Sequence, residues 1–410
     1  MQAMQVRGGK ERMRHKMIAK KMVKYVEGSS VTRAMFEEGK NMAAKFGAEN
    51  VFDFSLGNPS VEPPKEVNEA FIHIVQRESP NKLHGYMNNS GYEQVRETIA
   101  KSLNKRFGTA FSQDNIVMTV GAAGGLNVIL KTLIDPGDEV IAFAPYFGEY
   151  NNYVANFDGK MVVISPNIPT FQPNIDEFAE KITSKTKAVI INTPNNPTGV
   201  VYSEEMIKKL AVVLEEKQKE FGSAIYIISD EPYRELVYDG VDVPYLTKYY
   251  ANTIVGYSYS KSLSLPGERI GYLVIPNEVD DYENVICAAN VANRILGFVN
   301  APSLQQMVAA ECIDTATDVT IYDTNRRLLY DNLTEMGFSC VKPEGTFYLW
   351  VKVMGDDEGK FIEAAKKLNI LIVPGSSYMC PGYARIAFCV DTEMIKRSLP
   401  AFRKLAESFS

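Results

Sequence analysis

The chain has 410 residues, of which 45% are hydrophobic and 23% are charged, and its formal net charge is -6. A chain of this length exceeds one compact core of ordinary size, so we expect a large domain and a smaller one. The acidic balance offers no positive field to a nucleic acid or an anionic membrane surface. No apolar run approaches the roughly 20 residues of a membrane span, and no secretory signal is recognisable, so we expect a cytoplasmic protein.

The five cysteines are scattered along the chain and show no CxxC spacing. They predict reduced thiols and neither a disulfide framework nor a metal site. The first 24 residues are locally basic, with Met13, Met17, Ile18 and Met22 between the basic side chains. We interpret this segment as a helical arm rather than a binding patch, and residues 1–55 as the arm with one part of the smaller domain.

From about residue 92 to 276, short apolar runs alternate with longer amphipathic stretches. Several runs are continuously apolar, which is typical of strands buried on both faces of a mostly parallel sheet. The stretch 203–221 begins at a serine suited to cap a helix. Residues 56–320 are therefore predicted to form a large α/β domain with a seven-stranded, mostly parallel sheet between helices. The predicted strands are Ile116–Thr119, Val140–Ala144, Met161–Ile164, Ala188–Asn192, Ile225–Ser229, Thr253–Gly256 and Gly271–Ile275.

After about residue 320 the spacing of the apolar runs changes. Two predicted strands lie among three predicted helices, so residues 321–410 are expected to complete a smaller α+β domain to which both chain ends contribute. The strands are Phe347–Val351 and Ala384–Phe388, and the helices are Tyr322–Met336, Lys360–Leu368 and Thr392–Phe409.

A run of small residues, Gly121-Ala122-Ala123-Gly124-Gly125, follows the first predicted strand and precedes an apolar helix at Leu126–Leu133. Small residues at a helix start let backbone N–H groups approach an anion. The run fits neither GxGxxG nor a P-loop, which counts against nucleotide binding. An anion site and a plain tight turn are both open at this point.

Ser258-Tyr259-Ser260-Lys261 lies just past another predicted strand. A lysine at the end of a buried strand must be paired or neutralised, unless it reaches the surface. The hydroxyls and Arg269 would suit a phosphate. Arg269 would also keep the Lys261 amine deprotonated by like-charge repulsion, as a nucleophile toward an aldehyde requires.

Two further strand ends carry polar side chains. Asp230 follows an apolar strand, where it either caps a turn before Pro232 or pairs with a buried cation, such as the pyridine nitrogen of pyridoxal phosphate. Asn196 lies in an Asn-Asn-Pro-Thr-Gly segment, as a turn residue or as a donor to a phenolate oxygen.

Taken together, these motifs resemble the class I and II aminotransferases of fold type I, the aspartate aminotransferase superfamily. The match runs from Leu56-Gly57-Asn58-Pro59 to Ala384-Arg385-Ile386-Ala387, in the family's order. The resemblance implies a pyridoxal 5'-phosphate cofactor, carried by Lys261 as a Schiff base and paired with Asp230 at its ring nitrogen. It also implies amino acid and 2-oxo acid substrates and a homodimer with shared active sites.

The resemblance places the remaining roles on matching residues. Phe147 would stack on the cofactor ring, Asn196 and Tyr233 would contact its 3'-oxygen, and Tyr86 would reach the phosphate of the neighbouring subunit. The α-carboxylate of the substrate would lie on Arg385, with Asn196 and the backbone of Gly57. The phosphate would be held by Gly121, Ala122, Ala123, Ser258, Ser260 and Arg269.

The sequence departs from the family pattern in three places. Ala122 and Ala123 replace a polar side chain of many members, and the adjacent Tyr146 could take the role of Phe147. The position of the arginine that binds a second substrate carboxylate holds Ile295, with Arg294 beside it, and we interpret Arg294 as surface charge.

These residues predict a transaminase that moves an amino group from an L-amino acid to a 2-oxo acid by a ping-pong mechanism, with Lys261 as base and then acid. A carbon–sulfur β-lyase, another lyase or a cyclopropane-forming synthase on the same scaffold is the first alternative. A non-catalytic ligand sensor and a dehydrogenase are alternatives of other classes. The basic arm is too short for a DNA-binding module, and the dehydrogenase lacks its glycine fingerprint. The identity of the amino donor stays open.

Overall fold

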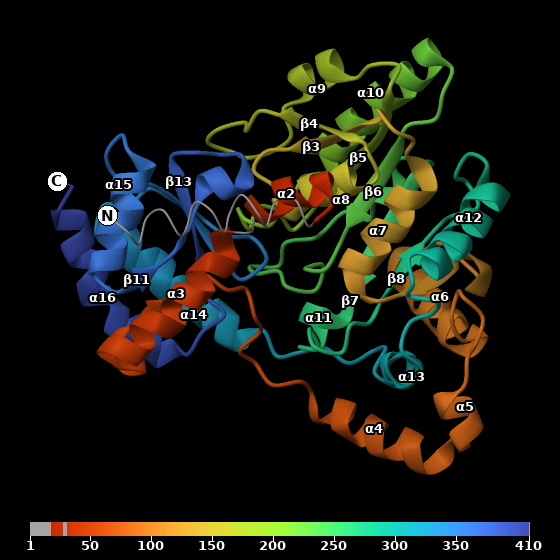
Figure 1. Ribbon diagram of the computed structural model, residues 1–410, viewed down its shortest axis with the longest axis horizontal. Helices are drawn as coiled ribbons and strands as arrows, with labels where there is room; N and C mark the ends of the chain where they lie inside the picture. Colours follow the sequence, from red (N-terminus) through yellow and green to blue (C-terminus); the bar gives the residue numbers. More distant parts are fainter. Residues whose placement is uncertain (1–17, 28–30, 410) are drawn as a thin grey trace.

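All seven predicted strands are present and form one sheet in the computed structural model, which describes residues 18–27 and 31–409 (Figure 1). The order of the strands is β2-β8-β7-β6-β5-β3-β4. β8 is antiparallel to its neighbours β2 and β7, and the other pairs are parallel, so the prediction of a mostly parallel sheet is confirmed. The strands are β2 (Ile116–Thr119), β3 (Glu139–Phe143), β4 (Lys160–Ile164), β5 (Thr186–Asn192), β6 (Tyr226–Asp230), β7 (Thr253–Ser258) and β8 (Gly271–Val274).

Helices cover both faces of this sheet. Successive side chains of a strand point to opposite faces, and in these strands both sets are apolar and must be buried. Val140 and Ala142 of β3 pack in one core with α7, α8 and α12, while Ile141 and Phe143 pack in another with α9 and α10. α4, α6 and α13 cover the part of the sheet around β2 and β8. These helices are α4 (Lys65–Arg77), α6 (Glu93–Phe107), α7 (Gly121–Leu133), α8 (Glu149–Asn156), α9 (Ile175–Lys181), α10 (Glu204–Phe221), α12 (Tyr282–Ile295) and α13 (Ser303–Glu311), with the short α5 (Pro80–His84) before α6.

A separate core surrounds the C-terminal strands. Its antiparallel sheet has the order β12-β13-β10-β9, and β1 pairs in parallel with β11 beside it. The N-terminal helix α3 (Val31–Phe46) belongs to this part of the molecule, since Glu38 forms an ion pair with Lys366 at 2.9 Å. The other elements are β1 (Phe52–Asp53), β9 (Cys340–Val341), β10 (Tyr348–Lys352), β11 (Ile370–Leu371), β12 (Val373–Pro374), β13 (Tyr383–Ala387), α14 (Thr320–Glu335), α15 (Glu358–Lys367) and α16 (Thr392–Glu407).

Two details differ from the expectations. The small-residue run 121–125 is not a turn before a helix but the first turn of α7 itself, because alanine is a strong helix former and only Gly121 has a positive φ, +67°. Most of the predicted basic arm, residues 1–17, lies outside the described residues. The end of the arm forms α2 (Lys20–Glu27). Lys21 Nζ of this helix forms an ion pair at 3.0 Å with Oδ1 of Asp158, which lies between α8 and β4. Within the described ranges, no helix is both long and apolar enough to cross a membrane.

Candidate active site

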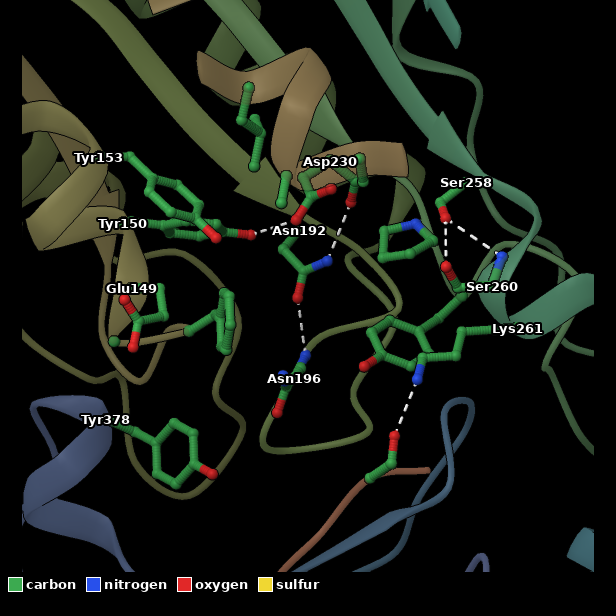
Figure 2. A pocket seen from close by; sticks show the side chains of 18 of the residues that line it. Glu149, Tyr150, Tyr153, Asn192, Asn196, Asp230, Ser258, Ser260, Lys261 and Tyr378 are labelled. Carbon is green, nitrogen blue, oxygen red and sulfur yellow. Dashed lines mark hydrogen bonds between the residues drawn. The ribbon is translucent and has the colours of Figure 1, made fainter. Parts of the chain in front are cut away.

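A cavity of about 740 Å³ lies where β5, β6 and β7 end, between the large sheet and the C-terminal sheet (Figure 2). Asn192, Asp230 and Ser258 are the last residues of these three strands, and all three line the cavity. In open α/β sheets this edge is the usual place for a ligand, because loops there carry side chains free of the sheet's own packing. Arg385 from β13 lines the opposite wall.

Lys261 lies in α11 (Tyr259–Ser262), one turn after β7. Its Nζ donates a hydrogen bond to the Gly57 carbonyl at 2.8 Å and lies 5.1 Å from the centre of the Phe347 ring. The pKa of Lys261 is lowered to about 8, mainly by burial, with smaller contributions from the positive charges of Arg385 and Arg269. Like-charge repulsion from Arg269 therefore contributes as expected, but burial is the main cause. An amine with such a pKa is deprotonated in roughly a tenth of molecules at pH 7, far more than an ordinary lysine.

Asp230 is buried at the end of β6, and its two carboxylate oxygens differ. Oδ2 accepts a hydrogen bond from the Tyr150 hydroxyl at 2.5 Å, while Oδ1 is buried without a partner. Burial raises the pKa of Asp230 to about 7, although the Tyr150 hydrogen bond lowers it. A buried carboxylate oxygen of this kind calls for a cation or an N–H donor.

Asn192, Asn196 and Arg385 form a chain of hydrogen bonds across the cavity floor. The Asn196 backbone N–H donates to Asn192 Oδ1 at 2.7 Å, and Asn196 Oδ1 accepts from Arg385 Nη1 at 3.1 Å. Arg385 Nη2 donates to the Ser55 carbonyl at 2.7 Å, and its Nε is buried without a partner. The guanidinium is stacked 4.2 Å from the centre of the Tyr348 ring. Arg385 is thus a fixed, buried cation, suited to a carboxylate.

The other end of the cavity is suited to a dianion. The N-terminus of α7 supplies free N–H groups from Gly121, Ala122 and Ala123. Gly121 must be glycine there, since its φ is positive and a Cβ would lie 2.7 Å from Arg269 Nη2. Arg269 is exposed to the cavity and donates to the Pro266 carbonyl at 2.9 Å.

Two serine hydroxyls complete this end. Ser258 Oγ donates to Ser260 Oγ at 2.7 Å and accepts from the Ser260 backbone N–H at 3.1 Å (Figure 2). Both serines line the cavity, because one ends β7 and the other follows it directly in α11.

The structure also shows which aromatic residues line the cavity. Phe147 lines it, whereas Tyr146 is buried and its hydroxyl donates to Asn151 at 2.8 Å, so Phe147 is the ring available for stacking. Tyr233 lines the cavity and its hydroxyl lies 3.1 Å from that of Tyr348. Burial raises the pKa of Tyr233 well above its usual value, so its hydroxyl remains a hydrogen-bond donor.

Two of the predicted site residues, Gly121 and Tyr86, are not among the residues that line this cavity. Tyr86 is 93% exposed in the loop between α5 and α6, so its role toward a neighbouring subunit stays a prediction. Arg294 and Ile295 are exposed at the end of α12. Neither contributes to the cavity of its own chain.

Sequence reasoning missed several residues that line the cavity. Asn192 is the last residue of a correctly predicted strand, and a polar side chain at the end of a buried strand could have indicated it. Tyr150 lies one helical turn after Phe147, which explains why both face the cavity. Tyr348 comes from β10 and Tyr378 from the turn between β12 and β13, and no local pattern marks either residue.

Comparison with known proteins agrees with this geometry. Residues 49–402 match the sequence model of the Aminotransferase class I and II family. The chain is 31% identical over 373 residues to an aspartate aminotransferase of Thermotoga maritima, covering 90% of this chain and 95% of that protein. It is 29% identical over 392 residues to an aspartate aminotransferase of Pyrococcus horikoshii, covering 92% and 95%.

Solved structures show the same fold. An amino transferase from Eubacterium rectale superposes with a TM-score of 0.94 at 47% identity, covering 96% of this chain and 99% of that one. The aspartate aminotransferase of Thermotoga maritima superposes with a TM-score of 0.84 at 29% identity, covering 94% and 99%. The fold and cavity define an enzyme that transfers amino groups between amino acids and 2-oxo acids. The chain belongs to the class I and II aminotransferases, within the fold type I superfamily.

Proposed function

We propose that this transaminase binds pyridoxal 5'-phosphate covalently at Lys261 and transfers an amino group from an L-amino acid to a 2-oxo acid in two half-reactions. The observation that carries the proposal is the buried, unpartnered Oδ1 of Asp230, which lines the same cavity as the Lys261 amine. A protonated pyridine nitrogen is the partner this oxygen lacks. The cofactor's aldehyde would meet a lysine whose pKa is about 8, which is reactive as a free amine.

The remaining cavity residues fit the other parts of the cofactor. Its phosphate would lie at the start of α7, against Gly121, Ala122, Ala123, Ser258, Ser260 and Arg269. Phe147 would stack on the ring, and Asn196 and Tyr233 would hydrogen-bond its 3'-oxygen. Asn192 would orient Asn196, since its Oδ1 already accepts from the Asn196 backbone.

Chemistry then follows from the positions of the side chains. When bound, the cofactor supplies an electron-withdrawing ring that stabilises negative charge at the substrate's α-carbon. Arg385 would bind the α-carboxylate, with Gly57 and Asn196 beside it, and so fix the direction of the α-C–H bond. The Lys261 amine would remove the α-proton as general base and then, as general acid, return it to the cofactor carbon that carries the amino group. The amino group stays on the enzyme until a 2-oxo acid takes it up.

We expect Lys261→Ala to abolish turnover, because the covalent anchor and the base are the same amine. Reduction of the holoenzyme with borohydride, followed by peptide mapping, should place a pyridoxyl group on the peptide that contains Lys261. Lys160→Ala, at an exposed position of β4, is the matched control and should behave like the wild type. Substantial turnover of Lys261→Ala, or a label on another lysine, would contradict the assignment.

The localisation, the oligomeric state and the domain division belong to the same proposal. We propose a cytoplasmic homodimer with shared active sites, supported by the free state of all five cysteines and by the exposure of Tyr86. The domain division is proposed as residues 1–55, 56–320 and 321–410. The pairing of β1 with β11 supports the first boundary, because it ties residues 52–53 to the C-terminal part of the chain.

A further inference from the structure

One charged side chain of the cavity has no part in the proposed function. Within the described part of the chain, the charged residues that line the cavity are Glu149, Asp230, Lys261, Arg269 and Arg385. The last four would hold the cofactor, its phosphate or the substrate α-carboxylate. Glu149 is left over, and it brings a negative charge to the cavity wall.

Glu149 lies on the wall of the cavity to which Tyr378 also belongs. It opens α8, and the segment just before this helix contacts the turn 375–378. The Tyr146 backbone N–H donates to the Tyr378 carbonyl at 3.3 Å, and a Cβ on Gly148 would lie 2.6 Å from the Ser377 carbonyl. The Tyr378 ring centre lies 5.1 Å from the Arg385 guanidinium. Figure 2 shows Glu149 between Tyr150 and Tyr378, on the other side of Asn196 from Lys261.

This position determines which part of a substrate approaches Glu149. When the carboxylate lies on Arg385, the amino group is on the cofactor and the α-C–H bond points to Lys261, one direction remains for the side chain. That direction leads away from the cofactor's phosphate, whose site is at Arg269 and α7, and toward the start of α8. The carboxylate of Glu149 therefore lies where the end of the side chain would be.

Glu149 is available for such a contact. Its Oε2 accepts a hydrogen bond from Asn152 at 2.8 Å, and among the described residues no lysine or arginine is recorded in an ion pair with it. An acidic residue in the first turn of a helix is ordinary, because it interacts favourably with the helix dipole. That role explains a carboxylate at this position but not its exposure to the substrate cavity.

We propose that Glu149 selects amino donors whose side chain ends in an ammonium or guanidinium group and disfavours dicarboxylic substrates. The inference rests on the proposed function and names the substrate class for it. Because the two half-reactions use the same cavity, the 2-oxo acid acceptor is subject to the same selection. This chain thus differs in its preferred substrate from the relatives named aspartate aminotransferases.

The first test compares three donors of similar length, ornithine, glutamine and glutamate, in the half-reaction of the purified holoenzyme, followed by cofactor absorbance. We expect ornithine to react fastest, and glutamate to be at least about tenfold less efficient than glutamine, from repulsion between two carboxylates in a partly buried site. Glu149→Gln should raise the efficiency with glutamate and lower that with ornithine, each about tenfold, and leave glutamine unchanged.

Glu283→Gln is the matched control, since Glu283 is also an acidic residue in the first turn of a helix but lies outside the cavity. It should leave all three donors unchanged. A wild-type preference for glutamate over glutamine would overturn the inference. An equal effect of Glu149→Gln on all three donors would do the same, because it would indicate a structural role alone.

A binding measurement keeps the inference independent of turnover. 5-Aminopentanoate and glutarate have the same length and share one carboxylate, but differ in the charge at the other end. Calorimetry with the holoenzyme should show tighter binding of 5-aminopentanoate, and Glu149→Gln should remove the difference. If no amino acid reacts with the wild type, the proposed function fails, whereas equal or tighter binding of glutarate would refute the role of Glu149.

Discussion

The reactivity of Lys261 is a property of its surroundings rather than of its type. A lysine in water has a pKa of 10.5, and burial together with Arg385 and Arg269 lowers the pKa of this one to about 8. The same burial raises the pKa of Asp230 to about 7, because the charged form of either group loses hydration. Each group is therefore only partly charged near neutral pH until a ligand provides the opposite charge.

The pKa of Lys261 can be measured on the protein without cofactor. Below pH 8 most Lys261 amines are protonated and unreactive, and above pH 8 most are free. We expect labelling with an amine-reactive reagent at limiting concentration, followed by peptide mapping, to rise through about pH 8 at Lys261. Labelling of exposed lysines such as Lys160 is measured in the same experiment as the reference. A Lys261 profile that coincides with theirs would contradict the role of burial.

At the scale of strands and helices, the ends of the elements form the cavity. β5, β6 and β7 are parallel neighbours, so their last residues reach one edge of the sheet although they are far apart in sequence. α7 adds its N-terminus to the same edge, with N–H groups directed at an anion. Gly121 permits this approach through its positive φ and its close contact with Arg269.

We expect Gly121→Ala to weaken cofactor binding, since a Cβ would displace Arg269 from the anion site. The control is Gly108→Ala, because Gly108 has a φ of +69° but no atom within 4 Å of an added Cβ. Both variants should lose about 1–2 kcal/mol of unfolding free energy from left-handed backbone strain. Only Gly121→Ala should show a raised cofactor dissociation constant in titrations followed by absorbance. Equal cofactor affinity in the two variants would show that the contact with Arg269 has no role.

At the scale of the whole molecule, the cavity needs both sheets and both ends of the chain. The hydrogen bond from Arg385 to the Ser55 carbonyl joins residues 330 positions apart. The Gly57 carbonyl accepts a hydrogen bond from Lys261, and β1 pairs with β11, so both interactions also join distant parts of the chain. A second subunit is proposed to complete the site through Tyr86, which is 93% exposed and lies outside the cavity of its own chain.

Mixed dimers test this proposal. Lys261→Ala and Tyr86→Ala homodimers should each be strongly impaired, the second through weaker phosphate binding. A purified heterodimer of the two variants contains one complete site, so we expect about half of the wild-type activity. Activity no higher than that of the Tyr86→Ala homodimer would contradict shared sites, and light scattering would show directly whether the chain is a dimer.

The sequence by itself determined the α/β class, the seven strands of the large sheet and the residues at their ends, because period, apolar continuity and turn residues are local signals. It also indicated Lys261, Asp230, Asn196, Arg269 and Arg385 as a set, through a resemblance that covers nearly the whole chain. It placed the start of α7 five residues late, since small residues read equally well as a turn or as a helix.

Only the tertiary structure decided which side chains meet. The choice of Phe147 over Tyr146, the pairing of Tyr150 with Asp230 and the position of Glu149 beside Tyr378 depend on contacts between segments far apart in the sequence. The pKa values of Lys261 and Asp230 depend on burial, which no single segment specifies. Local sequence thus fixes which residues can do the chemistry, and long-range packing fixes the distances and the loss of water that let them do it.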